Sequence, residues 1–337
     1  MTGKLPPSFL EKYVWRRHGR DDPRVLVGPG IGEDAAVIDM GDRVLVLHSD
    51  PITEAVEGIG WLALNIAAND VATAGARPLW ASVTILLPEG FGEELLDEIT
   101  RDLHRAAEEL GVSIVGGHTE EAPRLDRPIL VVTMLGEAPR DRYVRTGGAG
   151  PGDAVLVIKS AGLEGTSILA KDFRSLLESR GLSDGLLERA AGFAAEVSVV
   201  REALLLAELG ATSLHDPTEG GLIGGLVEVA LASGKTLEVW EESVPVRPET
   251  RSICEALGLD PLKLISSGAL IATVPPEKLA SVEEALRRLD VEYGVVGRVH
   301  EGAARLVIHR VDGRKEEYME PPVDELARVW EKYGSGG

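Results

Sequence analysis

The segment Trp61 to Arg77 restricts the fold more than any other part of the chain. Its helical stretch, about Gly60 to Ala74, is apolar on almost every side, and Gly75 with Pro78 beyond it is a common helix stop. Such a helix is stable only where other elements cover it all round. We therefore predict that this helix is buried in the fold.

Three polar residues interrupt this apolar helix. Asp70 needs a cation or several hydrogen-bond donors if it is buried, because an uncompensated carboxylate in the interior is costly. Asn65 and Asn69 are four residues apart and share one face. A structural hydrogen-bonded pair explains the two asparagines about as well as contact with a substrate does.

The other segments predict a mixed α and β chain of the α+β class. We expect strands where β-branched and apolar residues run together, and helices where apolar residues recur every three to four positions. Before residue 145 the pattern predicts a helix at Glu93–Leu110 and strands at Arg43–His48, Leu79–Leu87, Val112–Val115 and Ile129–Leu135. After residue 153 it predicts helices at Ser167–Leu177, Leu186–Leu209 and Glu219–Ala232, and strands at Ala154–Ile158, Leu237–Trp240, Ala269–Val274 and Ala304–His309.

A run rich in Gly and Pro, from Arg145 to Asp153, sustains neither a helix nor a ladder. The 337 residues exceed the usual size of a single core. We therefore predict two mixed α/β domains, 1–148 and 149–337.

The net charge of −20 argues against broad contacts with nucleic acid or an anionic membrane, which need clustered Lys and Arg. No stretch approaches the roughly 20 apolar residues of a membrane span. Cys254 is the single cysteine, so an internal disulfide is excluded and a reducing compartment is the simpler expectation. We expect a cytoplasmic protein that handles anionic substrates through a metal.

Two segments in the first half join glycines or a strand end to carboxylates. In Val27 to Ile38, the glycines Gly28, Gly30 and Gly32 allow close approach to a phosphate, and Asp34 can reach a metal bound to it. A mobile turn with a solvated Glu33-Asp34 pair is an equal alternative. Asp50 ends an apolar strand, a favoured place for catalytic groups, although Asp before Pro also simply forms turns.

Two later segments place polar groups beside paired glycines. In Ile114 to Glu121, a short buried strand leads into Gly116 and Gly117, and then into His118 and Thr119, which can meet phosphate or metal. A hydrogen-bonded surface histidine is the alternative for His118. In Leu214 to Leu222, either Asp216 or Thr218 can cap the following helix, whose first turn at Gly220-Gly221 then offers open amides to an anion.

In this order, the motifs resemble the aminoimidazole ribonucleotide synthetase (PurM-like) superfamily of ATP-dependent enzymes over nearly the whole chain. The resemblance rests on Gly32-Glu-Asp-Ala-Ala-Val37, Ser49-Asp50, Asn69 to Pro78, Gly116-Gly-His-Thr119, Pro151-Gly-Asp153 and Asp216 to Gly221. Gly162 to Leu169, His215 to Thr218, Gly258 to Leu262 and Ser266-Ser-Gly268 are similar to the hydrogenase-maturation (HypE-like) branch. Thiamine-monophosphate kinase is similar in the first three motifs only.

The resemblance implies a homodimer whose N-terminal sheets pair into an intersubunit barrel, with ATP near the interface. It implies Mg²⁺ held by Asp34, Asp50 and Asp70, with Asp50, Asp70 and His118 as catalytic residues. The implied nucleotide contacts are Gly28, Gly30, Gly32, Asn69, Gly116, Gly117, His118, Thr119, Asp216, Thr218, Gly220 and Gly221.

Two positions depart from the branch. Its members end in a cysteine that carries the reacting group, whereas this chain ends Tyr333-Gly-Ser-Gly-Gly337. His118 stands where the branch usually has an acidic residue, which removes one anionic metal ligand.

We hypothesise an enzyme that uses Mg-ATP to phosphorylate or activate an amide, carbonyl or acid oxygen of a small or protein-borne substrate, with a maturation-complex protein as a further partner. The alternatives are a catalytically silent, nucleotide-responsive dimeric scaffold and a thiamine-monophosphate kinase-like phosphotransferase. A site that binds a transition metal through His48, His118 and His215 is a further alternative.

Overall fold

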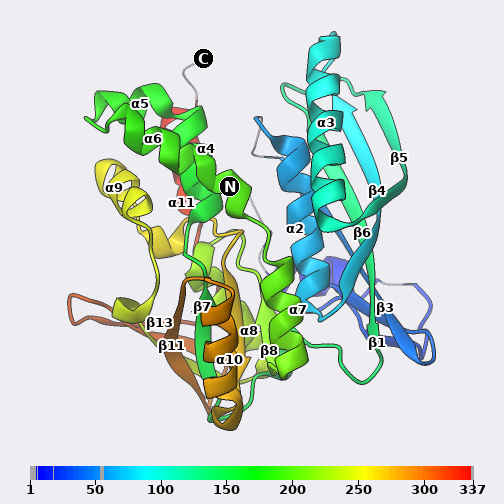
Figure 1. Ribbon diagram of the computed structural model, residues 1–337, viewed down its shortest axis with the longest axis vertical. Helices are drawn as coiled ribbons and strands as arrows, with labels where there is room; N and C mark the ends of the chain where they lie inside the picture. Colours follow the sequence, from blue (N-terminus) through cyan, green and yellow to red (C-terminus); the bar gives the residue numbers. More distant parts are fainter. Residues whose placement is uncertain (1–4, 6, 18, 54–56, 335–337) are drawn as a thin grey trace.

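The computed structural model describes residues 5, 7–17, 19–53 and 57–334, and it contains two sheets. The six-stranded sheet lies in the first half of the chain and the seven-stranded sheet in the second, on opposite sides of the molecule in Figure 1. This mixed α and β architecture agrees with the predicted fold class. The predicted boundary at 148/149 falls between the sheets and stays a prediction as a domain limit.

The first sheet has the strand order β1-β2-β3-β6-β4-β5. All neighbours are antiparallel except β4 and β5, which are parallel. Its strands are β1 (Val25–Val27), β2 (Ala36–Asp39), β3 (Arg43–Ile52), β4 (Arg77–Leu87), β5 (Ser113–Glu121) and β6 (Ile129–Pro139). The chain before it forms the short helices α1 (Pro7–Leu10) and η1 (Glu11–Trp15).

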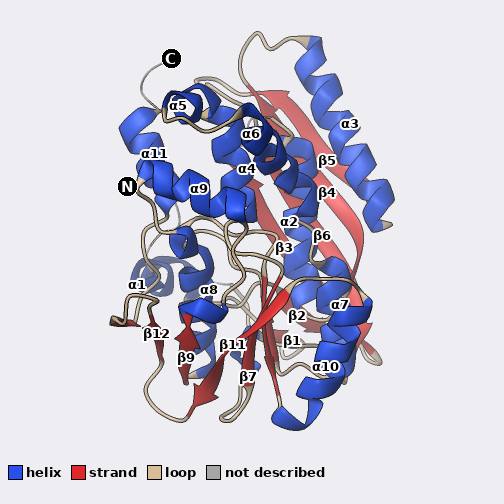
Figure 2. Ribbon diagram, turned by 60° about the vertical axis from the view of Figure 1, so that its left-hand side comes forward, coloured by secondary structure: helices blue, strands red, loops and turns tan. Residues whose placement is uncertain are grey.

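Helices α2 (Ile59–Thr73) and α3 (Glu93–Leu110) cover one face of this sheet (Figures 1 and 2). Every residue of α2 is buried, because the helix contacts β3, β6, α3 and, from the second half of the chain, α7 (Val200–Leu209). The prediction of a helix covered on all sides is confirmed. Helix α2 therefore lies between the two halves of the chain.

Among the residues that the structure describes, no helix covers the opposite face of the first sheet (Figure 1). Leu47, Leu135 and Trp80 are in register across β3, β6 and β4, and all three are partly exposed. Their neighbours in the same register alternation, such as Val46 and Met134, are fully buried on the helix side. Apolar side chains therefore lie at the centre of the uncovered face.

The second sheet has the order β13-β12-β9-β11-β7-β10-β8. Its strands are β7 (Ala154–Ile158), β8 (Ser213–His215), β9 (Thr236–Trp240), β10 (Leu270–Val274), β11 (Tyr293–His300), β12 (Arg305–His309) and β13 (Lys315–Tyr318). Helix α8 (Gly221–Ser233) packs on one face, and α7 with α10 (Pro276–Arg288) packs on part of the other. Both faces of β7 and β10 are consequently buried.

The remaining helices form a cluster beside the second sheet. They are α4 (Leu163–Asp172), α5 (Arg174–Ser179), α6 (Asp184–Ala191), α9 (Pro248–Leu257) and α11 (Glu325–Tyr333). Elsewhere in the second half and at its start, short helical turns lie at Thr146–Gly148, Gly192–Glu196, Glu241–Ser243 and Pro261–Lys263. Their shared core includes Cys254, whose thiol has its pKa raised to about 12 by burial. No helix in the described part of the chain is long and apolar enough to cross a membrane.

Five predicted elements were wrong in extent by more than two residues. Two of them, the strands at Arg43–His48 and Ile129–Leu135, continue to Ile52 and Pro139. The helix predicted at Leu186–Leu209 is broken by Gly192–Glu196 and an irregular stretch, and the helix at Ser167–Leu177 is two helices that meet at Phe173. The strand at Val112–Val115 is neither short nor buried: β5 runs through Gly116, Gly117 and His118 and is exposed along its length. An edge strand gains its stability from β4 on one side alone, which the local pattern does not reveal.

Candidate metal and nucleotide site

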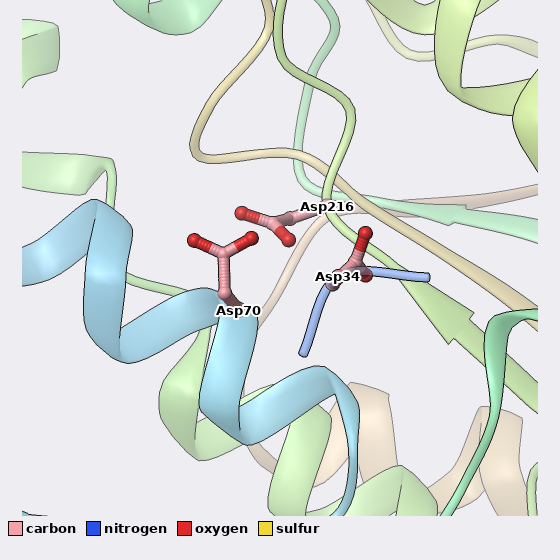
Figure 3. Close-up of side chains that lie close together, drawn as sticks. All are labelled: Asp34, Asp70 and Asp216. Atoms are coloured by element: carbon pink, nitrogen blue, oxygen red, sulfur yellow. The ribbon is translucent and has the colours of Figure 1, made fainter. Parts of the chain in front are cut away.

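Three carboxylates from separate elements converge between the two halves of the chain. Asp34 lies in the turn before β2, Asp70 in the last turn of α2, and Asp216 directly after β8. One oxygen of each lies within 4.8 Å of the others, and within the described residues this is the one such group of potential metal ligands. Figure 3 shows Asp70 and Asp216 pointing toward each other, with Asp34 beside them.

Asp34 is held at both carboxylate oxygens. Its Oδ1 lies 2.6 Å from Nδ1 of His215, and its Oδ2 accepts a hydrogen bond of 3.1 Å from the Thr73 hydroxyl in α2. The other ring nitrogen of His215 lies 3.0 Å from Oε2 of Glu228 in α8. Asp34 is thereby held between α2 of the first half and β8 of the second.

A second histidine lies beside Asp70. Nε2 of His48 is 3.4 Å from Oδ2 of Asp70, and its Nδ1 contacts the backbone carbonyl of Asp34. Ring nitrogens of His48 and His215 therefore already contact carboxylates of the site. His118, the third histidine of the alternative transition-metal site, lies elsewhere, so the structure does not assemble that site.

Close carboxylates repel, and His215 offsets part of this repulsion. Burial alone would lower the pKa of His215, but the adjacent carboxylates of Asp34 and Glu228 together raise it to about 10. The donor set is made of hard oxygen atoms, which suit Mg²⁺ better than a soft metal. The residues present therefore fit a divalent cation of that class.

Asp50 and Thr218 lie outside this group of three. They line a cavity of about 40 Å³ together with Glu164 of α4 and Ser267. The hydroxyl of Ser267 is fully buried there and has no hydrogen-bond partner among the described residues. Asp50 as a metal ligand stays a prediction, while Asp216 takes the third position in the observed group.

The Gly116 to Thr119 segment lies at the far edge of the first sheet. Asp50, Val132, Val83 and Gly117 are in register across β3, β6, β4 and β5. Three interstrand steps, about 14 Å, therefore separate Asp50 from Gly117 within one chain. His118 is exposed, with Nε2 3.1 Å from Glu120, and its segment lines a groove of about 350 Å³ beside α3. Its predicted catalytic role is untested, and one chain alone does not bring it to the carboxylates.

The two asparagines of α2 have separate partners. The amide of Asn69 donates to the carbonyl of Val197 at 2.9 Å and accepts from the N–H of Val199 at 2.8 Å, while Asn65 donates to the carbonyl of Trp61. Asn69 therefore links α2 to the second half of the chain. Its role as a nucleotide contact stays a prediction.

The predicted glycines differ in what they contact. Gly32 has a φ of +71°, and a Cβ there would lie 2.8 Å from the backbone oxygen of Glu228. At Gly28 and Gly30 a Cβ would make only ordinary van der Waals contacts, at 3.5 and 3.7 Å. The prediction of open amides at Gly220 and Gly221 was wrong. Both residues are buried. Gly220 itself is the N-cap of α8, and its N–H donates to Asp324.

Two residues of the site, Glu228 and Thr73, were not among the sequence predictions. His215 was predicted only as a ligand of the alternative transition-metal site, whereas the structure places its ring between the carboxylates of Asp34 and Glu228. Glu228 lies on an apolar helix and Thr73 at a helix end, and no local signal distinguishes them.

The chain matches one known family over most of its length. Residues 32–138 match the N-terminal domain of AIR synthase related proteins, and residues 150–309 match their C-terminal domain. The chain is 34% identical to carbamoyl dehydratase HypE of Rhodobacter capsulatus over 318 residues, which cover 90% of this chain and 89% of that protein.

Two solved structures have the same fold. The hydrogenase maturation protein HypE in complex with ATP is 30% identical, with a TM-score of 0.71 over 97% of this chain and 98% of that one. HypE in a complex with HypF is 25% identical, with a TM-score of 0.72 over 93% of this chain and all of that chain (100%). The chain therefore belongs to the AIR synthase-related, PurM-like family, within the group of hydrogenase-maturation HypE proteins.

Proposed function

We propose that this ATP-dependent enzyme holds Mg-ATP at Asp34, Asp70 and Asp216 and uses it to phosphorylate or activate an amide, carbonyl or acid oxygen. The substrate is small or protein-borne. The observation that carries the proposal is the convergence of three carboxylates from two halves of the chain. The relative solved with ATP supports the choice of nucleotide.

Each part of the site has a distinct task in this proposal. Bound Mg²⁺ would neutralise charge on the phosphoryl group in transfer. Asp34 and Asp70 hold their orientation through His215 and His48, so little rearrangement is needed on binding. The cavity lined by Asp50, Glu164 and Ser267 lies between the same halves and would orient the second substrate.

Calorimetry with ATP and Mg²⁺ tests the proposal. We expect binding by the wild-type chain and at least a tenfold loss in Asp70→Asn, because one charged ligand is removed. Asp102→Asn, which alters a carboxylate paired with Arg105 on α3, is the matched control and should bind as the wild type does. Absence of binding at millimolar nucleotide would reject the enzyme proposal.

We also propose that the chain works as a homodimer through the uncovered face of its first sheet. Leu47, Leu135 and Trp80 lie in register there without a covering helix. The predicted pairing of two such sheets into a barrel would bury them. In that dimer, segments of both chains would lie near the interface. The Gly116 to Thr119 segment could then contact a nucleotide bound by the partner chain.

A cytoplasmic location and a protein partner from a maturation complex complete the proposal. The relative solved with HypF supports a partner of that kind. Co-purification of this chain with candidate maturation proteins, in the presence and absence of ATP, tests it.

A catalytically silent, nucleotide-responsive scaffold is the second candidate function. The position of His118 favours it, because the exposed ring pairs with Glu120 and does not join the carboxylates of its own chain. Turnover separates the two functions. Release of ADP or AMP that is lost in Asp70→Asn would reject the scaffold.

A further inference from the structure

The contact between α8 and the Asp34 turn joins the two halves of the chain at the metal site. We propose that Glu228 and His215 are a positioning pair that holds Asp34 in its metal-binding orientation, so that α8 sets the affinity of the site for a divalent cation. This inference rests on the proposed metal site. His215 and Glu228 are not themselves among the three clustered carboxylates, Asp34, Asp70 and Asp216.

The geometry of the pair restricts the ring of His215. Nδ1 lies 2.6 Å from Asp34 and Nε2 lies 3.0 Å from Glu228, on opposite sides of one rigid imidazole. The side chains of His215, Asp34 and Glu228 are 3%, 9% and 12% exposed, so water competes little for these contacts. A rotation of the ring would lose both carboxylates at once.

A second contact joins the same two elements through the backbone. Gly32, two residues before Asp34, packs so closely on α8 that a Cβ would lie 2.8 Å from the backbone oxygen of Glu228 and 3.2 Å from its Cβ. The turn is therefore held against Glu228 through its main chain, and Asp34 is held to the same residue through His215. These contacts fix both the path of the turn and the direction of its carboxylate.

The expected consequence is a change in metal affinity. Partners that orient metal ligands typically contribute 10- to 100-fold in affinity, because a carboxylate free to rotate must be ordered when the metal binds. Thr73 holds the other oxygen of Asp34 at 3.1 Å but lies on α2, so it does not replace the contact with α8. Loss of Glu228 should thus weaken metal binding although the chain still carries all three carboxylate ligands.

The test is a titration of the full chain with Mn²⁺, with and without ATP. Electron paramagnetic resonance measures the concentration of free Mn²⁺ at each step. We expect Glu228→Ala to weaken Mn²⁺ binding about tenfold or more, and Glu228→Gln to stay within a few-fold of the wild type, because its amide oxygen still accepts from Nε2. The matched control is Glu238→Ala. Glu238 lies on β9 and contacts His309 at 2.8 Å and His300 at 3.1 Å. None of these three residues is among the clustered carboxylates Asp34, Asp70 and Asp216.

Each outcome decides the inference. Equal Mn²⁺ affinity in Glu228→Ala and the wild type, even with a lower melting temperature, would show a purely structural role and overturn the positioning pair. Loss of binding in Glu238→Ala as well would also overturn it, because the effect would be general. If Glu228→Ala does not fold, His215→Gln replaces it, with the same expected loss. Absence of Mn²⁺ binding in the wild type would instead reject the metal site of the proposed function.

Discussion

The backbone N–H of Gly220 donates to Oδ2 of Asp324 at 2.7 Å, so the N-cap residue of α11 also caps the N-terminus of α8. The other oxygen of Asp324 accepts from the N–H of Leu326 at 2.7 Å. A helix N-terminus favours a negative charge. In this chain the carboxyl group of Asp324 occupies that place, so the position predicted to hold an anionic ligand is filled from within.

Asp324 should make stability depend on pH. Burial, opposed by the N–H groups of Leu326, Gly220 and Ile265, raises its carboxyl pKa to about 7 from an ordinary value of 3.8. The folded chain therefore binds more protons than the unfolded chain between these values, and the contribution of Asp324 to the free energy of unfolding falls as pH rises from about 4 to 7.

Urea unfolding of the wild type and Asp324→Asn across this pH range measures the effect. The variant loses one acceptor at every pH, but the stability difference should shift by a few kcal/mol in its favour toward pH 7. Parallel curves for the two proteins would contradict the raised pKa.

Asn69→Ala should destabilise the chain by roughly 2 to 4 kcal/mol, because it leaves the carbonyl of Val197 and the N–H of Val199 without their buried partner. Asn65→Ala is the matched control: it loses one bond, to a carbonyl in its own helix, and should cost less. Chemical unfolding measures both. A variant Asn69→Ala that is stable but binds ATP poorly would instead support the predicted nucleotide contact.

Gly32→Ala should reduce both stability and metal affinity. The added methyl meets the backbone of Glu228, which cannot move aside as a flexible side chain would. Gly41 also has a positive φ, of +106°, but a Cβ there would have nothing within 4 Å. Gly41→Ala should therefore cost only the backbone strain, about 1 to 3 kcal/mol. Thermal unfolding with and without Mg-ATP compares the two. Equal losses in both variants would show that the contact with α8 is unimportant.

Leu135→Glu should convert the proposed dimer to a monomer, because it places a charge at the centre of the uncovered sheet face. Val311→Glu changes a residue that is 72% exposed in the other half of the chain, and it should remain dimeric. Light scattering after size-exclusion chromatography reports the mass. A wild-type chain that is monomeric at micromolar concentration would reject the dimer.

Local pattern was sufficient for much of the fold. The burial of α2 followed from its apolar surface, and α3 was predicted with its observed bounds because its apolar stripe repeats regularly. The local pattern did not predict β5 correctly, because the exposure of that strand depends on its place at the sheet edge. It also missed the break between α6 and α7, where tertiary contacts override helix propensity. The sequence also predicts a loose tail at Gly334 to Gly337, of which residues 335–337 lie outside the described residues.

The sequence by itself determined the family, the mixed fold and two members of the carboxylate group, Asp34 and Asp70, because ordered motifs and buried charges are visible in the residues. Only the tertiary structure showed that Asp216 lies beside Asp34 and Asp70, and that His215 and Glu228 stand behind Asp34. These contacts join the two halves of the chain across their packing surface. Their geometry depends on how the halves pack, which no local pattern specifies.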